Sequence, residues 1–358
     1  MKTIAIGIGL ALAVAAMSAS RVSAAEPNAK LKQLIAEASK EGKVDLEWGA
    51  GNLGGTDGGN AFEKAMNQKF GTDIRIRWTP GPSLPEVASA VIVSNAAGQA
   101  PPTDAFMSTT GYILLLWNKN VLKPIDWVGY MPDRITSNIV EADGAAVRIF
   151  TSLPGGIVYN TKLAPFAPTT LMDLLKPEWK GKISSTPYAA SFDLLGSDDG
   201  WGRERTLDYA RKLSQQIAGV MRCTDLERVA TGEFLAFAMD CSGRDWVNFQ
   251  EKGAPINYVV PADFGGFRYY YLAIPKNSAH PAAATLFALF LQTPEGQKII
   301  WTHDHFDLHT YPDSGMHGVV QAYIDKGVTF KEFTVGWAKV NPDIDKVEVE
   351  AAKILTQR

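Results

Sequence analysis

Residues 44–78, VDLEWGAGNLGGTDGGNAFEKAMNQKFGTDIRIRW, contain the pattern that decides the fold class. The run 44–48 predicts a β-strand, and six glycines follow it between Gly49 and Gly59. A helix is then predicted, because apolar side chains recur on one helical face at Ala61, Phe62, Ala65, Met66 and Phe70. The run 74–78 predicts a second strand. Strand, glycine loop, helix and strand form a βαβ unit, which predicts an α/β sheet.

Strands and helices continue to alternate along the chain. Short strands are predicted at 103–107 and 182–185, each followed by a polar loop and a helix. The roughly 330 residues after residue 25 are more than one hydrophobic core usually organises, so two domains are expected. The segment 152–155 is a candidate crossover between them, and no low-complexity linker is present. Domains joined in this way are expected to move about a hinge.

The first 25 residues have the pattern of a signal peptide. Lys2 is followed by an apolar run at 4–17, which is shorter than the roughly 20 residues of a membrane-spanning helix. Small residues at 22–25 suit cleavage by a signal peptidase, and no cysteine is present there to carry a lipid anchor. We therefore expect export to the periplasm. An uncleaved membrane anchor is the alternative.

The charge and the motifs exclude several functions. Without Lys2 and Arg21, the 35 basic residues become 33 against 38 acidic ones, and this mildly acidic balance argues against nucleic-acid binding. Neither Gly-x-Ser-x-Gly nor His-Glu-x-x-His occurs, so hydrolase chemistry has no recognisable motif. A catalytic site built from scattered residues stays open. We expect a soluble monomer that has no cofactor and is not an enzyme.

Only two cysteines occur, Cys223 and Cys241. In an oxidising compartment an isolated pair favours a structural disulfide over a reactive or metal-binding pair. Two separate buried thiols are the alternative.

Several segments, in this order along the chain, resemble the periplasmic solute-binding proteins of ABC importers. The branch they resemble is the extracellular solute-binding, ferric-ion-binding-like (type II) branch. The segments are PGGIVYNTKL at 154–163, TLMDLLKPEWKGKI at 170–183, VATGE at 229–233, KGAPI at 252–256, AIPKNSAHP at 273–281 and FLQTPEGQ at 290–297.

This resemblance implies a two-lobed periplasmic binding protein fold of the α/β class, with the ligand in the cleft between the lobes. Carried onto this chain, the first lobe is 26–153 with 275–358, and the second is 154–274. Crossing segments would form the hinge, and closure around a small-molecule solute would be recognised by an ABC transporter permease in the inner membrane. A protein that docks on a sensor is an alternative.

Loops that follow predicted strands supply the candidate ligand-binding residues, because helix N-termini there offer free N–H groups. The alternatives are a flexible glycine loop, a solvated loop, and aromatic side chains that belong to the core. The candidates are Trp48, Gly51, Asn52, Thr56, Thr109, Thr110, Tyr188, Ser191, Asp240, Ser242, Trp246 and Tyr269.

Glycine loops with hydroxyl groups favour an organic solute that carries an anionic group. Asp240 and Asp245 favour a cationic solute instead, since a carboxylate in a cleft attracts an amine.

Metal binding is a further alternative. The ferric branch uses two neighbouring tyrosines between the segments resembling VATGE and KGAP, yet residues 234–251 contain no tyrosine. The residues 269–271 are all tyrosine and could form a displaced pair. His303, His305 and His309 are candidate zinc or copper ligands, although such a segment is more often an ordered surface loop.

Overall fold

The predicted βαβ unit is present in the computed structural model, which describes residues 26–49 and 51–357. The strands β1 (Lys43–Gly49) and β2 (Arg75–Gly81) pair in parallel, and α2 (Gly55–Phe70) connects them. The predicted signal peptide lies outside the described residues. Within the described ranges, none of the helices combines the length and the apolar character needed to cross a membrane.

The predicted glycine loop is shorter than expected. It ends with the 3₁₀ turn η1 (Asn52–Gly54), and α2 already begins at Gly55. Close packing explains why glycine occurs inside this helix, since a Cβ atom on Gly58 would lie 1.7 Å from the Leu53 carbonyl oxygen. Gly54, at φ 78°, has a left-handed backbone conformation that favours glycine.

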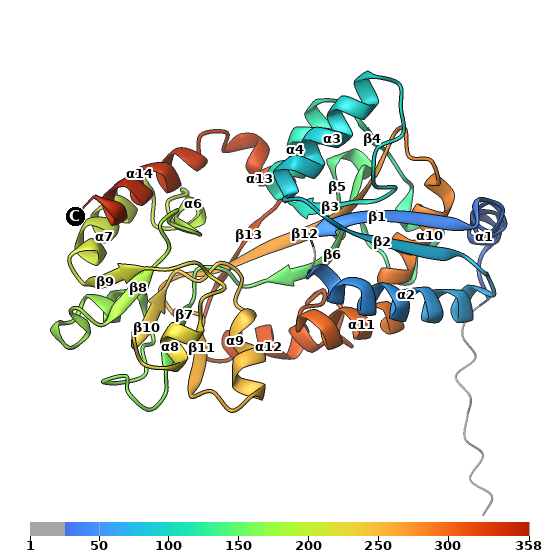
Figure 1. Cartoon of the computed structure of the whole chain (residues 1–358). Helices are drawn as coiled ribbons and strands as arrows, with labels where there is room; N and C mark the ends of the chain where they lie inside the picture. Colours follow the sequence, from blue (N-terminus) through green and yellow to red (C-terminus); the bar gives the residue numbers. More distant parts are fainter. Residues whose placement is uncertain (1–25, 50, 358) are drawn as a thin grey trace, which may run out of the picture.

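The first lobe is the larger group of elements on the right of Figure 1. Its most apolar helix, α10, is buried along almost its whole length and packs against α1. The further elements here are α1 (Ala29–Glu41), α3 (Leu84–Ala96), β3 (Phe106–Thr109), α4 (Thr110–Asn118), β4 (Leu122–Lys123), α5 (Trp127–Tyr130), η2 (Ser137–Ile139), β5 (Val140–Glu141), η3 (Ala142–Gly144), β6 (Ala146–Ser152), α10 (Pro281–Leu291) and α11 (Pro294–Asp304).

One long strand, β12 (Gly265–Pro275), runs from the junction between the lobes into the first lobe. It pairs with β6 on one side, and with β3 and β13 (Phe330–Phe333) on the other. Because side chains alternate along a strand, Arg268 and Tyr270 share one face of β12, whereas Tyr269 lies on the other.

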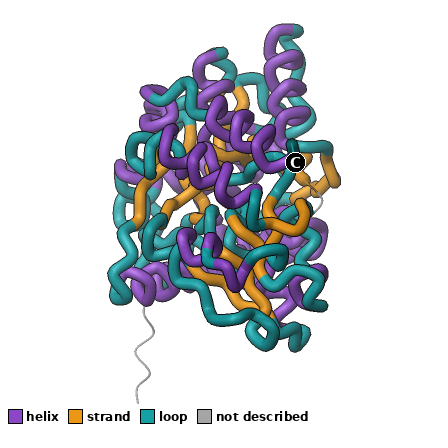
Figure 2. Tube along the Cα trace, turned by 90° about the vertical axis from the view of Figure 1, so that its left-hand side faces the viewer, coloured by secondary structure: helices purple, strands orange, loops and turns teal. Residues whose placement is uncertain are grey.

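The second lobe is built on a five-stranded sheet with the order β11-β7-β10-β8-β9. Figure 2 faces this lobe and shows helices on both sides of its strands. Its elements are β7 (Ile157–Asn160), η4 (Leu171–Leu175), η5 (Pro177–Trp179), β8 (Ile183–Ser185), α6 (Phe192–Leu195), α7 (Arg203–Ser214), β9 (Ile217–Val220), α8 (Glu227–Ala230), β10 (Ala236–Ala238), α9 (Asp245–Glu251) and β11 (Ile256–Val259).

The C-terminal segment departs from the predicted division of the lobes. After α12 (Gly315–Ile324) and β13, α13 (Val335–Val340) packs against α4 of the first lobe. The last helix, α14 (Asp345–Thr356), instead packs against α6 and α7 of the second lobe (Figure 1). Its apolar face, with Val347, Ala351 and Leu355, joins the core of that lobe, so residues 275–358 do not all belong to the first lobe.

Candidate functional site

A pocket of about 640 Å³ lies between the two lobes. The first lobe contributes α4 and the residues just before it, and the second lobe contributes the start of α6. The strands β12 and β13 contribute Arg268 and Phe333, and α13 and α14 complete the wall. The residues that matter for its chemistry are Thr109, Thr110, Tyr112, Asp193, Arg268, Phe333, Trp337, Lys339, Asp345 and Glu348.

The start of α4 is fixed to the hinge strands. Because β3 ends at Thr109 and α4 begins at Thr110, this turn lies where β3 and β13 meet along β12. The Thr110 hydroxyl donates a 2.9 Å hydrogen bond to the Phe333 carbonyl oxygen. The first turn of α4 is therefore held at the junction of the two lobes.

Carboxylates outnumber the cations in this pocket. Arg268 is paired with Asp193 at 3.2 Å, and both side chains are mostly buried. Asp345 and Glu348 lie one turn apart on α14. Burial, together with the negative charges of Asp193 and Asp345, raises the pKa of Glu348 to about 8. Burial and Asp193 also raise the pKa of Asp345. These shifts indicate a site with an excess of negative charge.

A second contact between the lobes lies on the same face of β12. Arg244, directly before α9, is 2.9 Å from Asp304 at the end of α11. Burial raises the pKa of Tyr270, while the positive charges of Arg268 and Arg244 oppose that rise. Tyr270 therefore lies within the electrostatic field of both arginines.

Unusual backbone conformations gather around these loops. Among the described residues, eight non-glycine residues have positive φ angles, and five of them belong to loops beside the junction. Such conformations cost of order 1–3 kcal/mol each and concentrate at functional sites. The five are Leu53, Ala189, Ser191, Met239 and His305.

The family model of the bacterial extracellular solute-binding proteins matches residues 59–312, which is most of the chain. The chain belongs to this family. Curated protein sequences give no match.

Solved structures share the fold of this solute-binding protein at low sequence identity. The substrate-binding protein of an ABC transporter from Agrobacterium tumefaciens is 16% identical, with a TM-score of 0.66 over 83% of this chain and 91% of that one. The spermidine/putrescine ABC transporter substrate-binding protein PotD from Streptococcus pneumoniae is also 16% identical, with a TM-score of 0.56, covering 82% and 96% of the two chains. AgtB from A. tumefaciens R10, in complex with agropinic acid, is 19% identical, with a TM-score of 0.61, covering 83% and 93%.

These comparisons confirm the predicted two-lobed α/β fold and the predicted role as an extracellular solute-binding protein. They leave the solute open, because the neighbours are named for different ligands.

The pocket contains two of the predicted ligand-binding residues from the first lobe, Thr109 and Thr110. Trp48 instead belongs to the core, with its indole N–H donating to the Ala105 carbonyl at 2.8 Å. The other three ligand-binding residues predicted in the first lobe do not line the pocket; they are Gly51, Asn52 and Thr56.

The predicted disulfide between Cys223 and Cys241 is confirmed. Tyr188, which is partly exposed, places its hydroxyl oxygen 3.4 Å from the Cys223 sulfur. Asp240 is completely buried, and this burial raises its pKa to about 6. Its carboxylate accepts hydrogen bonds from the backbone N–H groups of Ser242 and Gly243. Asp240 therefore shapes the loop that follows β10 and does not line the pocket.

Three other predicted ligand-binding residues also lie outside the pocket lining. Ser191 is buried and its hydroxyl donates to the Asp240 carbonyl oxygen at 3.3 Å. The Trp246 ring stacks on Tyr258. Tyr269 is fully buried on the opposite face of β12, with the Arg148 guanidinium 3.8 Å from its ring centroid.

The candidate metal ligands His303, His305 and His309 do not form a cluster. His305 approaches Glu251 at 3.9 Å, whereas His309 is hydrogen-bonded to the Thr151 hydroxyl at 2.8 Å. Burial lowers the pKa of His309 to about 4.

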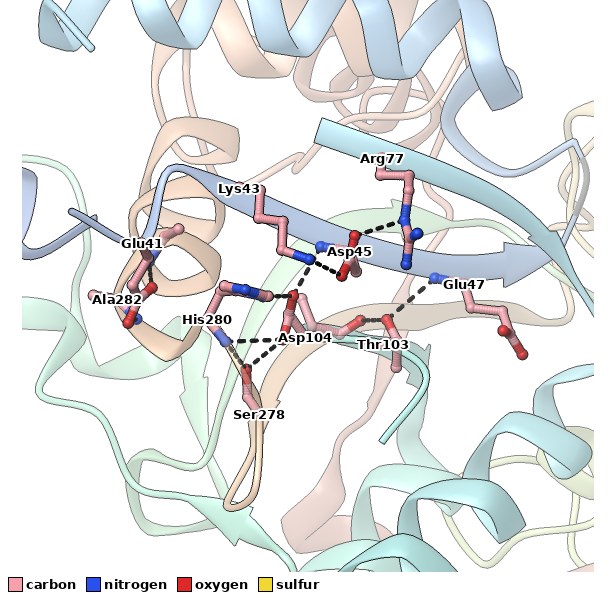
Figure 3. A network of polar contacts seen from close by, with 12 residues as sticks. Glu41, Lys43, Asp45, Glu47, Arg77, Thr103, Asp104, Ser278, His280 and Ala282 are labelled. Carbon is pink, nitrogen blue, oxygen red and sulfur yellow. Dashed lines mark hydrogen bonds and ion pairs between the residues drawn. The ribbon is translucent and has the colours of Figure 1, made fainter. Parts of the chain in front are cut away.

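The group of metal-ligating side chains found in the described residues comprises Asp45, Asp104 and His280, in the first lobe (Figure 3). Both carboxylates already have partners. Asp45 is paired with Arg77 at 2.7 Å, and Asp104 contacts the His280 ring at 2.8 Å. The network therefore joins β1, the turn before β3 and the start of α10.

Four charged residues of the pocket were not among the ligand-binding residues predicted from the sequence. Asp193, Arg268, Asp345 and Glu348 come from three elements that are far apart in the chain. The only local signal is that Asp345 and Glu348 are one helical turn apart beside an apolar stripe, which is also the pattern of an ordinary surface helix.

Proposed function

We propose that this protein works in the periplasm, where it holds a small organic solute in the pocket between α4 and α6 and delivers it to a membrane permease. The observation that carries the proposal is that the two lobes and the strands between them line one pocket of about 640 Å³. This volume is within the usual range for small-molecule sites. Residues 1–25 would direct export, and the mature chain would act as a monomer.

The hinge strands explain how binding changes the shape of the protein. Because β12 and β6 run at the junction of the lobes, small backbone rotations there move α6 relative to α4. A solute in contact with both helices stabilises the closed arrangement, and the permease then has a closed surface to recognise.

Two measurements test this proposal. Native mass spectrometry of protein taken from the periplasm without refolding should detect a retained solute and a mature N-terminus at Ala25 or Glu26. Adding the released solute back to emptied protein should reduce its radius of gyration in solution scattering and raise its melting temperature. Turnover of the solute would favour an enzyme, and intact Met1 in membranes would favour an anchored protein.

The pocket gives little support to the ferric-ion alternative. Tyr269 and Tyr271 belong to β12, and their side chains are fully buried on one face of it, beside Arg148 and Glu141. Burial raises the pKa of both phenols, so the tyrosinate form that binds ferric ion is disfavoured. Ferric binding with a tyrosinate absorption band would contradict this argument.

A further inference from the structure

The charge of the pocket bears on the chemistry of the solute, and this step rests on the proposed function. Arg268 is one of the two cations that line the pocket, and Asp193 already pairs with it. Lys339 is the other cation, on exposed α13 surface. Within the described residues, neither Asp345 nor Glu348 has a hydrogen bond or an ion pair through its carboxylate.

A partly buried carboxylate without a partner is unfavourable unless a proton or a cation neutralises it. When the pocket is empty, a proton neutralises the carboxylate of Glu348, which is half-buried. An ammonium group in the pocket would replace that proton, since it carries one positive charge and three hydrogen-bond donors.

The arrangement suits an organic cation better than a metal ion. Within the described part of the chain, the carboxylate oxygens of Asp193, Asp345 and Glu348 do not all lie within 4.8 Å of one another. One metal ion could not bind all three. Tyr112 and Trp337 also line the pocket, and aromatic rings offer contacts to the carbon skeleton and to the charge of an amine.

We propose that the solute carries a protonated amine, held by Glu348 and Asp345 of α14. The charge of this amine is opposite to that of the anionic group expected from the glycine loops and hydroxyls. The reason for the difference is that the Thr110 hydroxyl donates to Phe333 and Arg268 is engaged by Asp193, so two of the groups that could bind an anion are already occupied.

The experiment compares putrescine, butanediol and succinate, which share a four-carbon skeleton and differ in charge. Putrescine should raise the melting temperature of the solute-free protein, and succinate should not. Glu348→Gln should weaken putrescine binding by about tenfold or more, because a partly buried charge pair is lost. Glu350→Gln is the matched control, since Glu350 is on the same helix but pairs with Arg203 outside the pocket.

The outcomes separate this inference from the proposed function. An amine released from periplasmic protein, together with the putrescine shift, supports both. A released acid, a shift with succinate alone, or undiminished putrescine binding by Glu348→Gln overturns the inference and leaves the proposed function standing. Finding neither a released solute nor a shift with putrescine overturns both.

Discussion

Arg244 and Asp304 form an ion pair across the two lobes, with 2.9 Å between the guanidinium Nη1 and the carboxylate Oδ1. Asp304 is almost fully buried, and its other oxygen accepts a 2.9 Å hydrogen bond from the Leu53 backbone N–H. The Arg244 guanidinium lies 5.4 Å from the centre of the Phe306 ring. This pair therefore connects the loop after β10 with the end of α11 and the loop after β1.

Replacing Arg244 with Met should destabilise the protein by about 1–3 kcal/mol, because the buried Asp304 carboxylate loses its charged partner. It should also enlarge the solute-free protein in solution scattering, since a contact between the lobes is lost. Urea unfolding and scattering measure these effects. Arg222→Met is the control, because Arg222 is exposed where it pairs with Asp225, so its loss should have a smaller effect than the loss of Arg244. Equal effects of the two variants would contradict a special role for Arg244.

Removing the disulfide should lower the free energy of unfolding by about 3 kcal/mol in the chain-entropy model. The bond joins residues 18 positions apart and ties the loop after β10 to the segment after β9. Urea unfolding of the Cys223→Ser/Cys241→Ser variant measures the loss. A reducing agent should destabilise the native protein by a similar amount and leave the variant unchanged. Two alkylatable thiols in native, unreduced protein would refute the prediction.

Two glycines at the fourth position of their helices should respond in opposite ways to alanine. Gly58→Ala should destabilise the protein by more than about 2 kcal/mol, because its Cβ would overlap the Leu53 carbonyl oxygen. Gly318→Ala should stabilise it by about 0.5–1 kcal/mol, since no atom lies within 4 Å of its new Cβ and alanine favours a helix. Thermal unfolding compares the variants. A neutral Gly58→Ala would disprove the tight packing of the loop after β1.

The solute-free protein should lose stability as pH rises toward 8. Glu348 keeps its proton to about pH 8 in the folded state, whereas an unfolded glutamate releases it near 4.5. Between these values the folded state binds more protons, so the free energy of unfolding falls as pH rises and levels off above 8.

Urea unfolding at a series of pH values tests this dependence. Glu348→Gln should be close to wild type near pH 4 and more stable than wild type above pH 8. Asp240, whose pKa is about 6, contributes equally to both proteins, so their difference reports on Glu348. If the free energy of unfolding of the two proteins changed with pH in parallel, Glu348 would have an ordinary pKa and the prediction would be wrong.

The sequence was informative where a pattern is local. The run 44–78 predicts β1, α2 and β2, because strand and helix periodicities are properties of neighbouring residues. The pairing of Cys223 with Cys241 follows from the composition, since no other cysteine is available. The order of segments between 154 and 297 was sufficient to indicate the family.

Tertiary structure alone decided which charges meet in the pocket. Asp193, Arg268 and Glu348 lie on α6, β12 and α14, and no spacing in the sequence connects them. Their convergence depends on the return of α14 to the second lobe, where its apolar face packs against α6 and α7. Long-range packing of this kind brings together residues far apart in the chain, whereas periodicity describes only the face on which each residue lies.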